Sequence, residues 1–158
     1  MRFTGRIDGA DRVAAELSRL GEVGAKAVAD EVRRTAHLIE RDAKREAPVG
    51  VSGDLRRRIN TEFSDGGLVA EVHAGLPGGV GYAAAVELGT KPHFPPVAPL
   101  ALWAKRVLGD ERLGFVIARA IAERGTRAQP FLVPAYWTHI RDFAARLRSA
   151  MDRVIGRR

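Results

Sequence analysis

The sequence predicts a single α+β domain: a long N-terminal helix packed on a small antiparallel sheet, with an inserted helical segment and a C-terminal helix. Three patterns support this prediction. Apolar residues recur at helical spacing over residues 25–47, two alternating runs flank a Gly-containing turn within residues 55–74, and helical spacing returns over residues 135–155. A chain of 158 residues fits one domain, 1–158, that is long enough to bury a core.

The first residues carry a weaker pattern than the rest. Residues 1–9 predict a short extended segment, in which Phe3 and Ile7 share one face. Helical character is expected to begin near Asp8 or Asp11, since either side chain suits an N-cap.

A strong helix is predicted over residues 25–47. Its apolar stripe recurs every three or four positions and consists of Val28, Val32, Ala36, Ile39, Ala43 and Ala47. The opposite face is polar and carries Glu31, Arg34, Arg41, Asp42 and Arg45. Pro48 ends the helix, because proline disfavours helical geometry in the residue before it.

Two strands are predicted after this helix. Residues 55–63 alternate apolar and polar side chains, as a half-buried strand does. Ser64–Gly67 has the composition of a hairpin connection, and residues 68–74 alternate again. Because a lone hairpin is marginally stable in water, we expect it to pack on the long helix.

The second half is predicted to be mostly helical. Residues 76–81 indicate a flexible loop, and residues 82–90 a short apolar element. Residues 91–99 contain four of the eight prolines and are not expected to be regular. Two helices ending at Gly109 and near Gly125 follow, so a helical insertion is expected at about 95–124.

The closing helix is predicted over residues 135–155, after a loop from Thr126 to Pro134. One apolar face is expected to carry Trp137, Ile140, Phe143, Ala144, Leu147, Met151 and Val154. Trp103 and Trp137 occupy apolar helical positions, so both are predicted to belong to the core.

Composition excludes several classes of chemistry. The chain has no cysteine, which excludes disulfides, thiolate zinc sites and cysteine nucleophiles. The sequence has neither a stretch near the ~20 apolar residues of a membrane span nor a signal-peptide core. We therefore expect a protein made in the cytoplasm and used there or in a particle assembled there.

The positive charge is concentrated at one end. Residues 1–100 hold 14 Lys and Arg against 14 Asp and Glu, whereas residues 101–158 hold 12 against 5, so the net charge of +7 arises in the last third. The expected closing helix supplies candidates for contact with DNA or a neighbouring protein: Arg141, Arg146, Arg148 and Arg153. A solvated helix face explains the same residues equally well.

No catalytic, metal-binding or cofactor-binding motif is present. The four histidines lack the spacing of a metalloprotease pair and are expected at a surface or interface, and no glycine-rich run carries a phosphate-binding lysine. No serine lies in a nucleophile elbow. Glu87, in an apolar stretch, is predicted to cap a structural element or to pair with arginine across an interface.

Three motifs in order resemble those of one known family. Residues 45–57 read R-E-A-P-V-G-V-S-G-D-L-R-R, residues 82–90 read Y-A-A-A-V-E-L-G-T, and residues 129–135 read Q-P-F-L-V-P-A before a terminal helix. This order is similar to that of the tail-completion or neck (head–tail joining) proteins of long-tailed bacteriophages and prophages, the gene-product-ten-like family. Ser52 stands where threonine is commoner, and residues 91–127 are longer than the short loop of compact members.

The resemblance implies a structural, non-enzymatic virion protein. Its copies are expected to form a closed ring, sixfold or twelvefold, at the head–tail junction, joining connector to tail and letting DNA pass. Expected partners are other copies, the adjacent head-completion or connector and tail-terminator proteins, and DNA in the lumen, with no membrane and no cofactor. Candidates for fixing loops or subunit contacts are Glu87, Thr90, Phe94, Phe131 and Pro134.

Two other functions remain open at this point. A basic, non-specific DNA-binding module accounts for the C-terminal arginines, although no recognition-helix motif is visible. A small enzyme with an active site at Glu87 and His93 is the other alternative.

Overall fold

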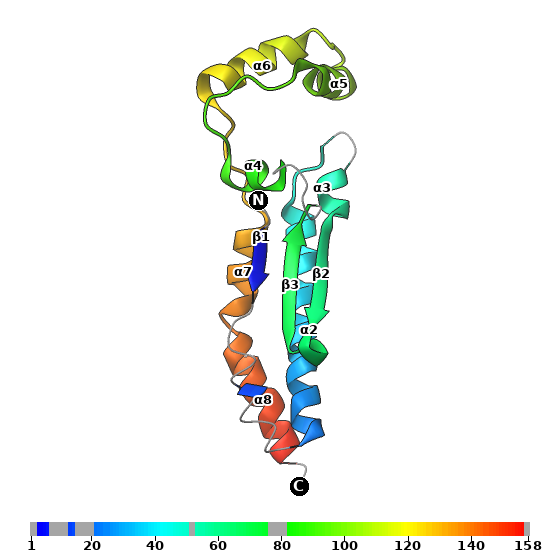
Figure 1. The fold of residues 1–158 in the computed structure, drawn as a ribbon, viewed down its shortest axis with the longest axis vertical. Helices are drawn as coiled ribbons and strands as arrows, with labels where there is room; N and C mark the ends of the chain where they lie inside the picture. The colour runs from blue at the N-terminus through cyan, green and yellow to red at the C-terminus, as the bar shows by residue number, and fades with distance from the viewer. Residues whose placement is uncertain (1–2, 7–12, 15–20, 51–52, 76–81, 157–158) are drawn as a thin grey trace.

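The protein is a long rod with a helical arm across one end (Figure 1). The structure, a computed structural model, describes residues 3–6, 13–14, 21–50, 53–75 and 82–156. Helix α2 (Glu22–Glu46) runs along the rod, with a three-stranded sheet on one side of it and helices α7 (Leu132–Ile140) and α8 (Phe143–Ile155) along another. Helices α5 (Val97–Leu108) and α6 (Leu113–Arg124) form the arm. The α+β fold class is confirmed.

The predicted apolar stripe of α2 forms the centre of the core. All six of its residues are buried: Val28, Val32, Ala36, Ile39, Ala43 and Ala47. The helix ends where the sequence predicts, since Ala47 leaves helical geometry before Pro48. The earlier helix expected from Asp8 or Asp11 lies largely outside the described residues. Val13 and Ala14 are the described part of this segment, and both are helical.

The polar face of α2 is not simply solvated, because α8 and α7 pack along it. Glu31 and Asp42 are buried, at 5% and 8% exposure. Arg146 of α8 donates through Nε to Glu31 Oε1 at 2.7 Å, and His139 Nε2 of α7 lies 2.6 Å from Asp42 Oδ2. A second hydrogen bond to Asp42, from the Arg41 guanidinium, outweighs burial and lowers the Asp42 pKa to about 2.

The sheet has the strand order β1-β3-β2, with both outer strands antiparallel to β3. Strands β2 (Ile59–Ser64) and β3 (Val69–Ala74) confirm the predicted hairpin, and β1 (Phe3–Arg6) shows that part of the extended N-terminal segment pairs with β3. Alternate residues of β3 enter the core beneath α2: Ala70, Val72 and Ala74.

The first part of the predicted strand 55–63 is wrong. Asp54–Arg57 forms a short helix, α3, that starts after Gly53 in the left-handed region. Arg56 of this turn donates through Nε to the Ala47 carbonyl at 2.8 Å and through its terminal nitrogen to the Arg45 carbonyl at 3.1 Å. These carbonyls at the end of α2 lack helical partners, so satisfying them outweighs the local strand pattern.

The closing helix is also broken, at Arg141 and Asp142, into α7 and α8. The terminal nitrogen of Arg146 donates to the freed His139 carbonyl at 3.0 Å and to Thr35 Oγ1 at 3.1 Å. The break turns Phe143, Leu147 and Met151 into the core, while Trp137 stays 54% exposed. The prediction that Trp137 belongs to the core is therefore wrong.

Replacing Arg146 tests the buried network between α2 and α8. Arg146→Ala is expected to lower the free energy of unfolding by about 3 kcal/mol, because it leaves Glu31 buried without its cation. Urea denaturation measures this change. Arg148→Ala, at an exposed position of the same helix, is the matched control and is expected to stay within about 0.5 kcal/mol. Equal losses in the two variants would contradict the network's role.

Candidate functional site

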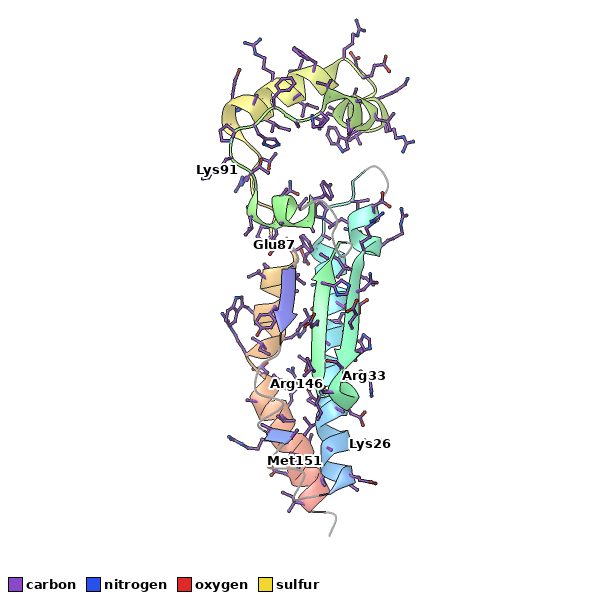
Figure 2. The ribbon with its side chains drawn as sticks, viewed as in Figure 1. Lys26, Arg33, Glu87, Lys91, Arg146 and Met151 are labelled. Carbon is purple, nitrogen blue, oxygen red and sulfur yellow. The ribbon has the colours of Figure 1, made fainter. Side chains whose placement is uncertain are left out.

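The joint between the rod and the arm is organised by one buried carboxylate. Glu87 of helix α4 (Tyr82–Leu88) is 3% exposed. Its Oε2 accepts hydrogen bonds from the Phe131 and Leu132 backbone N–H groups at 2.8 and 3.0 Å, and its Oε1 accepts one from Val133 N–H at 2.9 Å. Figure 2 shows Glu87 between α4 and the start of α7.

Glu87 therefore caps α7 from a distant part of the sequence. The first N–H groups of a helix have no partner within it, and the positive end of the helix dipole favours an anion there. The residue at the N-cap position, Phe131, has no side-chain acceptor of its own. The prediction that Glu87 caps a structural element is confirmed, and the carboxylate that does so is fully enclosed by its own chain.

The two segments that lead to the arm are clasped together directly beyond this cap. Thr90 and Thr126 form an antiparallel bridge with reciprocal backbone hydrogen bonds of 3.1 Å, and their hydroxyls lie 3.0 Å apart. Gln129 N–H also donates to the Val86 carbonyl at 2.8 Å. These bonds fix where the chain leaves the rod and where it returns.

Two glycines make this close approach possible. Gly89 and Gly125 both have φ of +71°, a conformation that favours glycine. A Cβ on Gly125 would collide with the Thr90 carbonyl, and one on Gly89 with the Thr126 carbonyl. Side chains at either position would force the two segments apart.

The arm has small residues inside and large apolar residues outside. Gly114 of α6 lies so close to Ala101 of α5 that a Cβ would overlap its backbone, and Ala104 and Ala118 are fully buried. The large apolar side chains of the arm are more than half exposed: Phe94, Leu102, Val107, Leu108, Phe115 and Val116. Phe94 and Phe115 contact each other edge to face, with ring centroids 6.3 Å apart.

A groove of about 470 Å³ lies where the arm meets the rod. It is lined from the arm side by Leu100, Trp103 and Ile121, and from the rod by Val49 and Tyr82. A neighbouring hollow of about 360 Å³ shares the Leu100, Trp103 and Tyr82 walls, so the two adjoin each other. The arrangement suits apolar contact with another chain better than chemistry on a small substrate.

A family model described as "Bacteriophage HK97-gp10, putative tail-component" matches residues 11–89, half of the chain. The chain belongs to this HK97-gp10-like family. The resemblance seen in the sequence is thereby confirmed, and it indicates a structural, virion-associated bacteriophage protein. A search of curated proteins and a search of solved structures each found no match. The family match ends at Gly89, just before the segment that leads to the arm.

The five residues chosen as contact candidates divide into two groups. Glu87 and Phe131 are buried in their own chain, and Thr90 belongs to the clasp, so these three fix the loops that carry the arm. Phe94, at 60% exposure, and the exposed Pro134 at the start of α7 are accessible to other molecules. Their role at a subunit contact of the HK97-gp10-like protein stays a prediction.

The arginines of the two C-terminal helices also divide. Arg141, Arg148 and Arg153 are exposed. Arg146 instead points between α8 and α2, where its bonds to Glu31, Thr35 and His139 hold it (Figure 2). Contact with DNA or with a neighbour stays a prediction for the three exposed arginines, whereas the structure gives Arg146 an intramolecular role.

The histidines and Glu87 do not assemble a reactive centre. Among the described residues, no three His, Asp or Glu side chains gather in a way that suits a metal ion. His73 is buried on β3, so it is not the surface side chain that was expected. His93 lines the groove, whereas Glu87 does not. Within the described part of the chain, no helix is both long enough and apolar enough to cross a membrane.

Sequence reasoning missed the clasp and the groove. The sequence places Gly89 in a short apolar element and Gly125 at a helix end, but their need for glycine arises from contact with a segment far along the chain. The one available signal was the pairing of Gly-Thr at residues 89–90 with Gly-Thr at residues 125–126.

Removing the Glu87 carboxylate is expected to destabilise the joint. Glu87→Ala leaves three backbone N–H groups of α7 without their anion, so the free energy of unfolding should fall by about 3 kcal/mol. Glu87→Gln should lose less, because one acceptor oxygen remains. Thermal and urea denaturation measure both variants. Glu46→Ala, at a position with a 55% exposed side chain, is the control, and a loss there as large as at Glu87 would refute the capping role.

Gly125→Ala and Gly109→Ala separate crowding from backbone strain. Both glycines have positive φ, but an added Cβ meets nothing within 4 Å at Gly109. Gly109→Ala is expected to cost about 1 kcal/mol from strain alone. Gly125→Ala should cost more and should also speed hydrogen exchange of the Thr126 amide, which bonds to Thr90 in the clasp. Equal exchange rates in the two variants would show that the clasp does not depend on Gly125.

Proposed function

We propose that this HK97-gp10-like protein forms a closed ring at the head–tail junction of a tailed phage, joining the connector to the tail and letting DNA pass. Other copies of the chain and the adjacent connector and tail-terminator proteins are its proposed partners. The family supports a structural role in the particle, and the position at the junction, the ring and the passage of DNA are the proposal.

The observation that carries the proposal is the rigid arm with an uncovered apolar surface. Its helices contact each other through small residues, so Phe115, Val116 and Leu102 remain more than half exposed. Surfaces of this kind mark sites of contact with other macromolecules. The clasp fixes the direction of the arm relative to the rod, as a repeating assembly requires, because each copy must present its contacts at the same angle.

DNA contact is proposed for the exposed arginines of α7 and α8. Arg141, Arg148 and Arg153 lie along one end of the rod and carry no carboxylate partner among the described ion pairs. In a ring, such side chains either line the lumen or meet the next ring. Phosphate contact through arginine is independent of sequence and depends strongly on salt.

Electron microscopy of particles from the phage or prophage that encodes the chain tests the proposal. A terminal peptide tag on the chain, located by antibody or by fitting the rod and arm into a map, is expected to mark a ring between head and tail. An untagged phage preparation is the control for antibody specificity. Finding the chain absent from mature particles, together with tight and salt-sensitive DNA binding by the purified protein, would favour the DNA-binding alternative instead.

A further inference from the structure

We propose that the arm of one copy docks into the groove of a second copy, in a head-to-tail contact. The arm contributes the exposed side chains around Phe94, Phe115 and Val116, and the groove of the next copy receives them between Tyr82 and Trp103. This inference rests on the proposed ring, for which it names the surfaces that join neighbouring subunits.

The arm cannot bury its own large side chains. Its helices already touch at Ala101 and Gly114, and Ala104 and Ala118 are fully buried, so no space remains between α5 and α6 for a Leu or Phe. The elements of the rod do not cover the outer surfaces of these helices either, since the arm meets the rod mainly at the Thr90–Thr126 clasp and the groove. Among the described residues, nothing further covers these outer surfaces, so a second molecule can do so.

The exposed apolar area of the arm approaches what one side of a protein interface needs. Six arm side chains are between 51% and 60% exposed, which at about 100 Å² each gives roughly 600 Å² of apolar surface in total. A standard interface buries about 800 Å² on each partner, of which a little over half is apolar. On the receiving copy, the rim of the groove is exposed as well, with Val49 at 62% and Tyr82 at 59%.

The same chain supplies both halves of the contact, which is why the proposed occupant is a second copy. The arm offers exposed apolar side chains, and the groove offers a concave surface of about 470 Å³ walled by Leu100, Trp103 and Tyr82. When the arm of one copy occupies the groove of the next, each pair still has one free arm and one free groove. The contact can therefore repeat from copy to copy, and the copies form a closed ring when the successive rotations add up to a full turn.

Rigidity favours this contact. Because the clasp already holds the arm in place, docking orders little additional backbone and loses little affinity to entropy.

Cross-linking between single-cysteine variants tests the contact, because the natural chain has no cysteine. Full-length Phe115→Cys and Tyr82→Cys are purified separately, mixed over a range of concentrations and treated with a short bis-maleimide. The mixture is expected to give a cross-linked pair joined between these two positions, identified by mass spectrometry, in several-fold excess over either variant alone. Trp137→Cys replaces Tyr82→Cys in the matched control, since Trp137 is 54% exposed outside the arm and groove.

Three results overturn the inference. They are no cross-link above the Trp137 control at any concentration, an equally strong link to Trp137→Cys, and a dominant Phe115-to-Phe115 link, which would indicate a symmetric arm-to-arm contact. A second measurement avoids dependence on cross-linking geometry. Phe115→Glu should weaken self-association in sedimentation by about tenfold or more, since docking would bury an unpaired carboxylate, whereas Trp137→Glu should leave it unchanged.

Failure of this inference is distinguishable from failure of the proposed function. A chain located in a ring at the head–tail junction, but without the Phe115-to-Tyr82 link, retains its place in the particle and uses other surfaces to join its neighbours. A chain that shows the link but is absent from particles self-associates as inferred and acts elsewhere.

Discussion

The buried Glu87 carboxylate is the constraint on which the rest of the structure depends. It joins the end of α4 to the start of α7 through three charge-assisted hydrogen bonds, and both segments that carry the arm leave the rod beside it. A buried carboxylate without partners would cost several kcal/mol. Glu87 is therefore stable in this position only when α7 begins at Leu132, and α7 begins there with its N–H groups satisfied only when Glu87 is present. The two requirements fix the base of the arm.

A second polar network holds the rod along its length. Helix α2 is covered on two sides, by the sheet and by α7 and α8, so its polar face needs internal partners. Arg146 meets Glu31, and His139 meets Asp42, each between α2 and a C-terminal helix. These pairs specify the register of the helices, because a slip of one turn would leave a buried charge without its partner. The apolar stripe of α2 supplies most of the buried surface, and the ion pairs select one register of α7 and α8 against it.

Periodicity predicted the elements whose structure depends on their own neighbours in sequence. The α2 stripe from Val28 to Ala47, the β2–β3 hairpin and the helix ends at Gly109 and Gly125 all lie where local patterns placed them. The predictions that were wrong concern elements whose structure depends on residues far away in the sequence. Helix α3 replaced part of a predicted strand because Arg56 satisfies the end of α2, and the break between α7 and α8 is accompanied by a bond from Arg146 to the His139 carbonyl.

The same distinction applies to the candidate site. The sequence predicted that Glu87 either caps an element or pairs with arginine across an interface. Nothing local indicated that its donors are the backbone N–H groups of Phe131, Leu132 and Val133. Phe94 was singled out as a contact residue and is indeed exposed, whereas Phe131 looked equivalent in sequence and is 1% exposed. Phe131 is held at the start of α7 by its hydrogen bond to the buried Glu87. Phe94 lies beyond the clasp, in the segment that leads to the arm.

The rod has a well-buried core, whereas the arm is poorly covered, and this difference separates the residues that stabilise the fold from those that are accessible to a partner. Stability is concentrated where α2, the sheet and the C-terminal helices share a core, so changes to the outer surface of the arm cost the fold little. The clasp nevertheless transmits orientation from rod to arm, because Gly89 and Gly125 bring two backbones into direct contact with no flexible side chain between them. An exposed apolar surface is a liability in a free monomer. On an arm held at a fixed angle, such a surface suits a partner that meets every copy in the same orientation, which is what the proposed ring requires.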